Sequence, residues 1–366
     1  MRRIVLTLTL LCFSLGLTTI AACTATAGET FIPADHANLV YVGRVSFKNP
    51  KAPAYTYPGI QIHAIFEGTS VAMKTKPETG YYMVEIDDLE PFKIHPERPD
   101  SIAPIAENLG KGPHRLTLTY CNEGLIMKPA FYGLILDAGC TLPEKPQLPE
   151  RRIEFIGNSI TCGYGNEGKP TDKKFAYRTQ NVYNTYEAFA ARELGAQWMV
   201  VARSGIGLYR NCNGNRNGDK ITMRDLYDYT LFGTSGERWD FGRYTPDVVC
   251  VNLGTNDTTN PSYNAALLTD AFKQFVRRLR GKYPKAKIVL LTGTMINGKR
   301  LADLQAAHKA AIADAAARGD HEVYRLDFTP ADGSLGYGTH KHPSLAQHRQ
   351  MAQELVPFLK KITGWQ

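Results

Sequence analysis

Residues 155–165 have the sequence FIGNSITCGYG, and the fold of the second half of the chain can be worked out from it. Residues 153–156 (IEFI) predict a short, mostly apolar strand, and Gly157 lets the chain turn sharply after it. Ser159 then stands just past the carboxyl end of the strand, where its hydroxyl can be exposed at a sheet edge. In a plainer interpretation, Asn158 and Ser159 only cap a helix.

Strands and helices alternate from residue 151 onward. Strands are predicted at residues 153–156, 198–202, 247–253, 288–291 and 323–328. Helices are predicted at residues 184–195, about 262–282, about 301–317 and from about Ser344. This alternation predicts an α/β fold, a parallel sheet with helices on both faces. In such sheets the active site lies at the carboxyl ends of the strands.

Three further loops follow strands of this sheet and hold groups suited to catalysis. Gly205, in the segment SGIG, offers an unhindered backbone N–H, and Asn256, in GTND, has an amide that can donate to a developing oxyanion. His342, in HKHPS, can accept a serine proton. Glycine and polar residues are common in any loop that follows a strand, so no single loop indicates catalysis. The indication of an active site comes from the combination of the loops.

In this order the four loops resemble the blocks of the SGNH (GDSL-like) hydrolase superfamily. The resemblance assigns the block residues to Ser159, Gly205, Asn256 and His342. FIGNSITCGYG is similar to the first block, with Asn158 where the family usually has Asp. The segment NLGTND (252–257) is similar to the third block, and HPS with His348 is similar to the last.

The resemblance implies acyl transfer through a serine. Ser159 would attack an acetyl carbonyl while His342 takes its proton. The backbone N–H groups of Ser159 and Gly205, together with the side chain of Asn256, would hold the oxyanion. No metal or other cofactor is expected, because the chain has no CxxC spacing and His340, His342 and His348 lack a convincing further ligand.

The third catalytic group of the superfamily is missing from its usual place. Most members have an Asp two or three residues before the His, where this chain has His340 and Thr339. We therefore predict a Ser–His dyad, with His342 oriented by a backbone carbonyl or another polar group. An Asp from a more distant loop is the alternative. The candidates for it are Asp257, Asp327 and Asp332.

Three aromatic residues in or near the site loops are candidates for stacking on a sugar. They are Tyr164, Tyr209 and Trp239, with Tyr209 preferred because it lies four residues past Gly205. Packing in a core is the competing interpretation for each of them. A disulfide between Cys162 and Cys212, both near the predicted site, is a further hypothesis.

Residues 29–142 have a different pattern, with many short strands separated by turns, which predicts an all-β sandwich. Strands are expected at residues 59–66, 71–73, 81–86, 92–94, 115–120 and 132–136. Residues 143–149 (PEKPQLP) predict a stiff linker. The expected domains are therefore a β-sandwich at 29–142 and a hydrolase domain at 150–366.

A β-sandwich ahead of an SGNH domain resembles carbohydrate esterase family two. Gly43-Arg44 and FEGTS (66–70) fit that family. The resemblance implies a jelly-roll first domain, a Ser–His dyad, and removal of acetyl groups from plant polysaccharides such as xylan and glucomannan. Two other functions stay open, a non-catalytic glycan-binding lipoprotein and an SGNH lipase or thioesterase.

The N-terminus predicts export. MRR followed by the apolar run at residues 4–22 is the layout of a secretory signal peptide. The segment IAAC resembles the bacterial lipobox, so we predict a signal peptide at residues 1–23 and lipidation of Cys23, which would anchor the protein to the cell envelope. Cleavage after Ala27 and a retained membrane anchor are the alternatives.

Composition and charge exclude several classes of protein. Of the 366 residues 43% are hydrophobic and 21% are charged, which argues against a disordered chain or a coiled coil. The net charge is +8, and without Arg2 and Arg3 the balance is 41 basic to 35 acidic residues, or +6. No block of like charges is present, so no nucleic-acid partner is expected.

Overall fold

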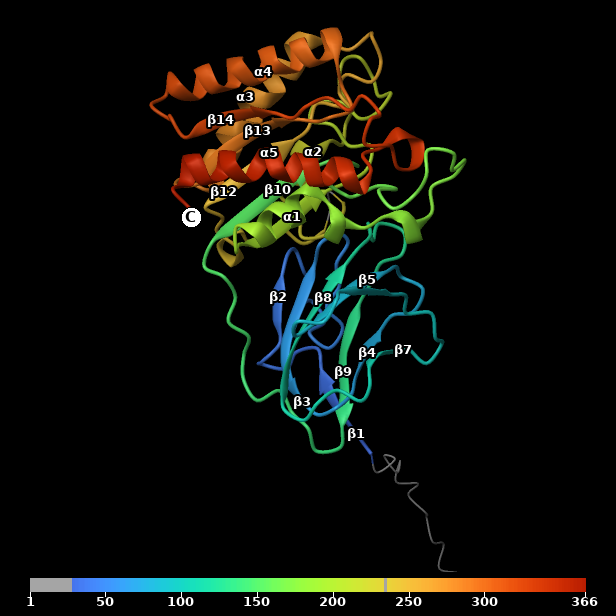
Figure 1. Cartoon of the computed structure of the whole chain (residues 1–366). Helices are drawn as coiled ribbons and strands as arrows, with labels where there is room; N and C mark the ends of the chain where they lie inside the picture. Colours follow the sequence, from blue (N-terminus) through green and yellow to red (C-terminus); the bar gives the residue numbers. More distant parts are fainter. Residues whose placement is uncertain (1–27, 234–235) are drawn as a thin grey trace, which may run out of the picture.

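The computed structural model describes residues 28–233 and 236–366. The chain forms an all-β part with two antiparallel sheets, followed by an α/β part with a parallel sheet (Figure 1). This arrangement confirms the predicted fold class. The predicted signal peptide and Cys23 lie outside the described residues. Within the described ranges, no helix is long and apolar enough to cross a membrane.

The all-β part is a sandwich of a four-stranded and a five-stranded sheet. The first sheet has the order β1 (Glu29–Pro33), β9 (Phe131–Asp137), β4 (Val71–Thr75), β7 (Ile102–Ala106). The second has the order β2 (Val40–Val42), β3 (Gln61–Glu67), β8 (Pro113–Tyr120), β5 (Tyr82–Ile86), β6 (Phe92–Ile94). As the alternating pattern predicts, Ile62, Ala64 and Phe66 of β3 are buried in a core that both sheets share.

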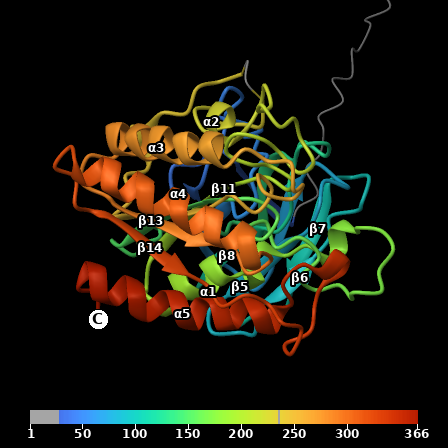
Figure 2. The same cartoon turned by 90° about the horizontal axis from the view of Figure 1, so that it is seen from above.

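The α/β part is built on five parallel strands. Their order is β11 (Gln197–Ala202), β10 (Arg152–Gly157), β12 (Val248–Asn252), β13 (Lys287–Thr292), β14 (Val323–Asp327). The helices are α1 (Tyr186–Glu193), α2 (Met223–Leu226), α3 (Ala265–Lys282), α4 (Gly298–Ala316) and α5 (Leu345–Thr363). Helices α3 and α4 cover one face of the sheet, and α1 and α5 cover the other (Figure 2).

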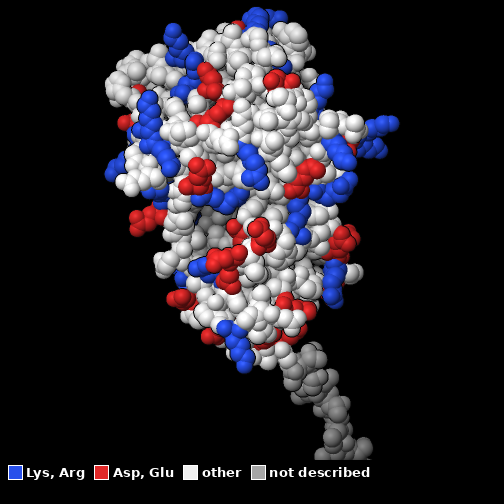
Figure 3. All heavy atoms as spheres, viewed as in Figure 1, with Lys and Arg blue, Asp and Glu red and all other residues white. Residues whose placement is uncertain are grey.

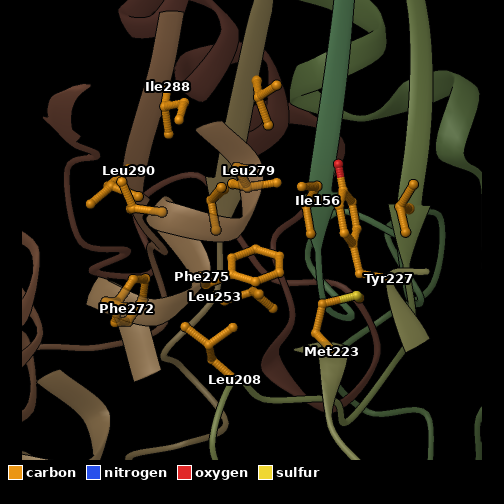
Figure 4. Close-up of a cluster of buried hydrophobic side chains, with 14 of the residues drawn as sticks. Ile156, Leu208, Met223, Tyr227, Leu253, Phe272, Phe275, Leu279, Ile288 and Leu290 are labelled. Atoms are coloured by element: carbon orange, nitrogen blue, oxygen red, sulfur yellow. The ribbon is translucent and has the colours of Figure 1, made fainter. Parts of the chain in front are cut away.

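The apolar stripe of α3 forms much of the core on its side of the sheet. Phe272, Phe275 and Leu279 of this helix are fully or almost fully buried, together with Ile288 and Leu290 of β13 (Figure 4). This burial, rather than helix propensity, supplies most of the stability of the helix. On the face of the molecule shown in Figure 3, basic and acidic side chains are interspersed without a large patch of one sign.

The five cysteines in the described part of the chain have free thiols, so the predicted disulfide between Cys162 and Cys212 is wrong. Cys162 is buried, whereas Cys212 is exposed on a surface loop. The burial of Cys162 raises the pKa of its thiol well above the ordinary value, so the thiol stays protonated and inert.

A buried ion pair joins the two parts of the molecule. Arg44 of the sandwich is fully buried and lies 3.2 Å from a carboxylate oxygen of Glu154 on β10, which is also fully buried. Arg44 also donates to the carbonyl oxygens of Tyr227 and Tyr229. Its guanidinium lies 4.7 Å from the ring centre of Tyr227 and 5.3 Å from that of Trp239. This contact fixes the sandwich against the parallel sheet.

We predict that Arg44→Met lowers the free energy of unfolding by about 3–5 kcal/mol, because Glu154 is then left buried without its counter-charge. Chemical denaturation followed by circular dichroism measures this change. The double variant R44M/E154L is the control, and it should recover most of the loss. A single variant as stable as the parent protein would show that the pair does not hold the interface.

Candidate active site

Ser159 stands at the carboxyl end of β10, in a series of turns rather than at the cap of a helix. The turns are closed by backbone bonds from Cys162 N to Asn158 O and from Tyr164 N to Ser159 O. The geometry shows why Gly157 is needed, since a Cβ at this position would lie 2.0 Å from the Thr161 hydroxyl oxygen. Glycine is therefore required at position 157 because no side chain would fit there as the chain turns.

His342 lies next to this serine. Its Nε2 is 2.9 Å from Ser159 Oγ, and its Nδ1 is 3.2 Å from the carbonyl oxygen of Thr339. A carbonyl only accepts hydrogen bonds, so Nδ1 must be the protonated nitrogen and donate to Thr339. Nε2 is then free to accept the serine proton, which is the tautomer that a general base requires.

A left-handed turn brings the Thr339 carbonyl to this histidine. His340 and Lys341 both have positive φ angles, 53° and 59°. Non-glycine residues in this region cost about 1–2 kcal/mol each, and such strain clusters at functional sites. The turn is held by the bond from Thr339 N to Gly165 O and by that from Thr339 Oγ1 to Asp172 Oδ2. The strained turn at His340 and Lys341 is therefore what places the Thr339 carbonyl next to His342 Nδ1.

The three candidate aspartates have partners of their own. Asp332 Oδ1 accepts from Ser334, and Asp327 pairs with Arg325 and Gln305. Asp257 is fully buried and accepts the backbone N–H groups of Leu208, Tyr209 and Arg210. Among the hydrogen bonds of the described residues, none joins His342 to a carboxylate.

Gly205 and Asn256 lie on neighbouring loops that are tied together. Asn256, just past β12, donates from Nδ2 to the carbonyl oxygen of Ile206 at 2.7 Å. Gly205 has a φ of +77°, and a Cβ at its position would meet no atom within 4 Å. Glycine is therefore favoured here by its backbone conformation, and the open space beside it leaves room for a ligand.

Sequence reasoning missed Glu123, a residue of the loop after β8 in the sandwich. Its carboxylate accepts the backbone N–H of Ser204 at 2.6 Å and the Ser204 hydroxyl at 2.5 Å, and it also accepts from Gln180 Nε2 at 2.9 Å. Ser204 directly precedes Gly205, so the sandwich fixes one of the predicted oxyanion loops. No local signal in the sequence reveals this contact, because the two residues are 81 positions apart.

The three aromatic candidates occupy different surroundings. Tyr164 is at the site, where its ring centre lies 4.4 Å from that of His342. Tyr209 is almost fully buried in the core and its hydroxyl accepts from Asn264 N, so the preferred stacking residue is wrong. Trp239 is also buried and packs against Arg44 at the domain interface, so it too is not available to a sugar.

The electrostatic surroundings keep His342 neutral. Burial lowers the pKa of its imidazole to about 4, an effect only partly opposed by the hydrogen bond to the Thr339 carbonyl. His348 is buried and accepts from Tyr186 N, and the exposed His340 contacts the Tyr164 hydroxyl. His340, His342 and His348 thus each have a hydrogen-bond partner of their own.

A parallel α/β sheet with a serine, a neutral histidine and amide donors at its carboxyl edge defines a serine hydrolase of the SGNH class. Comparisons with known proteins agree with this class. Residues 41–146 match the profile "Carbohydrate esterase 2 N-terminal", and residues 155–350 match the profile "GDSL-like Lipase/Acylhydrolase family". The chain belongs to carbohydrate esterase family two.

Three relatives illustrate the similarity. "Cellulase/esterase CelE" of Acetivibrio thermocellus is 36% identical over 90% of this chain, which spans only 40% of that protein's length. An "Acetylxylan esterase / glucomannan deacetylase" of Cellvibrio japonicus is 28% identical, with 91% of both chains covered. The structure of a family two carbohydrate esterase from Clostridium thermocellum in complex with cellohexaose is 34% identical, with a TM-score of 0.82 over 90% of this chain and 100% of that one.

We predict an acid limb near pH 4 in the profile of kcat/KM for a small acetyl ester. His342 must be neutral to accept the serine proton, and its pKa of about 4 keeps it neutral until the pH falls through that value. Steady-state rates between pH 3 and pH 8 measure the limb, with enzyme returned to neutral pH as the stability control. A midpoint near the ordinary histidine value of 6.5 would contradict the buried environment.

We predict that Glu123→Gln lowers kcat about tenfold while KM for a small acetyl ester changes little. The substitution weakens charge-assisted bonds that fix Ser204, and so affects the oxyanion loop more than ground-state binding. Steady-state kinetics on 4-nitrophenyl acetate measures the split between kcat and KM. The control is Glu144→Gln on an exposed part of the chain. An unchanged kcat in Glu123→Gln would show that the contact serves folding alone.

Proposed function

We propose that this chain is a serine esterase that removes O-acetyl groups from plant cell-wall polysaccharides or oligosaccharides such as xylan and glucomannan. The observation that carries the proposal is the hydrogen bond of 2.9 Å between Ser159 Oγ and His342 Nε2, at the carboxyl edge of the sheet. A serine with this partner is activated for acyl transfer. The names of the relatives supply the substrate class.

The reaction proceeds through an acetyl-enzyme. Ser159 Oγ attacks the acetyl carbonyl carbon as His342 Nε2 takes its proton, giving a tetrahedral intermediate with a negatively charged oxygen. The N–H groups of Ser159 and Gly205 and the Nδ2 of Asn256 donate to this oxygen, each donor contributing about 2.7–4 kcal/mol. His342 then protonates the departing sugar oxygen, and water activated by the same histidine releases acetate.

The dyad works without a carboxylate because His342 is already held in the required tautomer by the Thr339 carbonyl. A carbonyl oxygen carries only a partial charge, so it stabilises the transient imidazolium less than an aspartate would. It also leaves the resting pKa of the histidine low. The weaker stabilisation of the imidazolium and the low resting pKa both arise because His342 is paired with a carbonyl dipole and not with a carboxylate.

The relatives, named as an acetylxylan esterase / glucomannan deacetylase and as a family two carbohydrate esterase, favour a sugar ester over a long acyl chain, which argues against a lipase. The intact set of Ser159, His342, Gly205 and Asn256 argues against a purely glycan-binding protein. We further propose that residues 143–149 separate the two domains, and that the protein is exported and lipid-anchored through Cys23. An unmodified mature N-terminus at Gly28, found by mass spectrometry, would contradict the anchor.

We predict that Ser159→Ala lowers kcat for acetate release from acetylated xylan or glucomannan by at least about a thousandfold, because the nucleophile is lost. In contrast, Asp332→Asn and Asp327→Asn should stay within about twofold of the parent enzyme, since neither carboxylate contacts the dyad. Acetate release from xylan, glucomannan and cello-oligosaccharide, measured side by side, tests both claims. An aspartate variant as inactive as Ser159→Ala would refute the dyad.

A further inference from the structure

A hollow of about 440 Å³ opens between the sandwich and the α/β part, on the side of β5 and β6. Its walls include Tyr81, His95 and Met127 from the sandwich and Tyr177 and Arg178 from the segment after Ser159. The volume lies within the range of small-molecule binding sites. We refer to this feature as the interdomain hollow. The predicted catalytic groups are not among its lining residues.

A series of aromatic rings connects the catalytic histidine to the interdomain hollow. The ring of Tyr164 lies 4.4 Å from that of His342 and 4.4 Å from that of Phe175. Phe175 in turn meets Tyr177 edge-on, with 5.1 Å between ring centres. Tyr164, Phe175 and Tyr177 are all partly exposed. They form a continuous aromatic ridge from the reacting groups to one wall of the hollow.

The opposite wall is also aromatic and comes from the other domain. Tyr81 and His95 are stacked, with ring centres 4.1 Å apart and planes within 11° of each other. The loop that places Met127 on this wall also exposes Ile126, at 78%, and Leu125, at 41%. Such surfaces suit the C–H faces of pyranose rings, which gain free energy by burying apolar area against aromatic side chains.

Resting on the proposed function, we propose that the interdomain hollow is a subsite for the polysaccharide main chain and takes neutral sugar residues that flank the acetylated one. The ridge leads the chain from Ser159 to the hollow, where Tyr177 and the Tyr81–His95 pair contact successive sugar faces. Glu97 and Arg178 lie among the rings and supply acceptors and donors for sugar hydroxyls.

The charges around the hollow favour a neutral ligand. Glu78 and Glu97 line it with the guanidinium of Arg178. Glu97 is hydrogen-bonded to His95, and the Lys76 ammonium lies 3.2 Å from the carbonyl oxygen of Met127, so the charges around the hollow are nearly balanced. A uronic acid would bring a further negative charge beside two carboxylates, and like charges placed together cost affinity. Lys93, near the Tyr81 ring, is already paired with Glu167. The subsite therefore discriminates between neutral main chains and those with dense acidic decoration.

The proposal is tested by comparing acetylated glucomannan with 4-nitrophenyl acetate as substrates of the full chain. Tyr177→Ala and His95→Ala, one from each wall, should raise KM for the polymer about tenfold more than KM for the small ester, because a subsite contributes uniform binding. The matched control is Phe31→Ala, which removes a half-exposed aromatic side chain of β1 outside the hollow. Equal losses on both substrates, or none on the polymer, would overturn the subsite.

A binding measurement tests this subsite independently of the proposed function. Calorimetric titration of Ser159→Ala with unacetylated mannohexaose or cellohexaose should show binding that weakens about tenfold when Tyr177→Ala is added. Unchanged binding in the double variant would overturn the subsite even if the enzyme deacetylates polymers. If the parent enzyme releases no acetate, the proposed function fails, and the titration still decides the subsite. Tighter binding of an oligosaccharide bearing glucuronic acid would overturn its neutral specificity.

Discussion

Parallel strands place all their carboxyl ends at one edge of a sheet, and the site depends on this geometry. Ser159 follows β10, which lies between β11 and β12 in the sheet. The loops after those two neighbours provide Gly205 and Asn256, and the bond from Asn256 to Ile206 ties them together. His342 arrives from the loop after β14 and completes the set. Residues separated by 183 positions, Ser159 and His342, are thereby held within hydrogen-bond distance.

Among the residues that the structure describes, His342 has no acidic hydrogen-bond partner, and its Nδ1 faces the backbone carbonyl of Thr339 instead. His340 and Lys341, the two residues before His342, both have positive φ angles, and this conformation brings the Thr339 carbonyl within hydrogen-bond distance of His342 Nδ1. Their conformational cost is offset by the bonds that Thr339 makes to Gly165 and Asp172. The turn therefore fixes the tautomer, and burial keeps the ring neutral down to about pH 4.

The sequence supported a correct prediction of the five parallel strands and of the residues on their carboxyl ends, because buried strands and βα loops have local signatures. The short strands β1, β2 and β7 were missed, since β2 has three residues and β7 contains Pro104. Glu123 and the interdomain hollow depend on contacts between distant segments, which no local pattern encodes. Tyr209 and Trp239 were misplaced because proximity in sequence to a site loop does not determine which way a side chain points.

The sandwich lies beside the site and also supplies residues that position it. Arg44 fixes its position on β10, Glu123 accepts from Ser204 next to Gly205, and Tyr81 and His95 form one wall of the hollow. The most direct test of the account is a crystal structure of the full chain with an acetyl-mimicking phosphonate bound to Ser159. The phosphonyl oxygen should accept hydrogen bonds from Ser159 N, Gly205 N and Asn256 Nδ2, with the Thr339 carbonyl still on His342. A carboxylate on His342 Nδ1, or a phosphonyl oxygen pointing away from these donors, would contradict it.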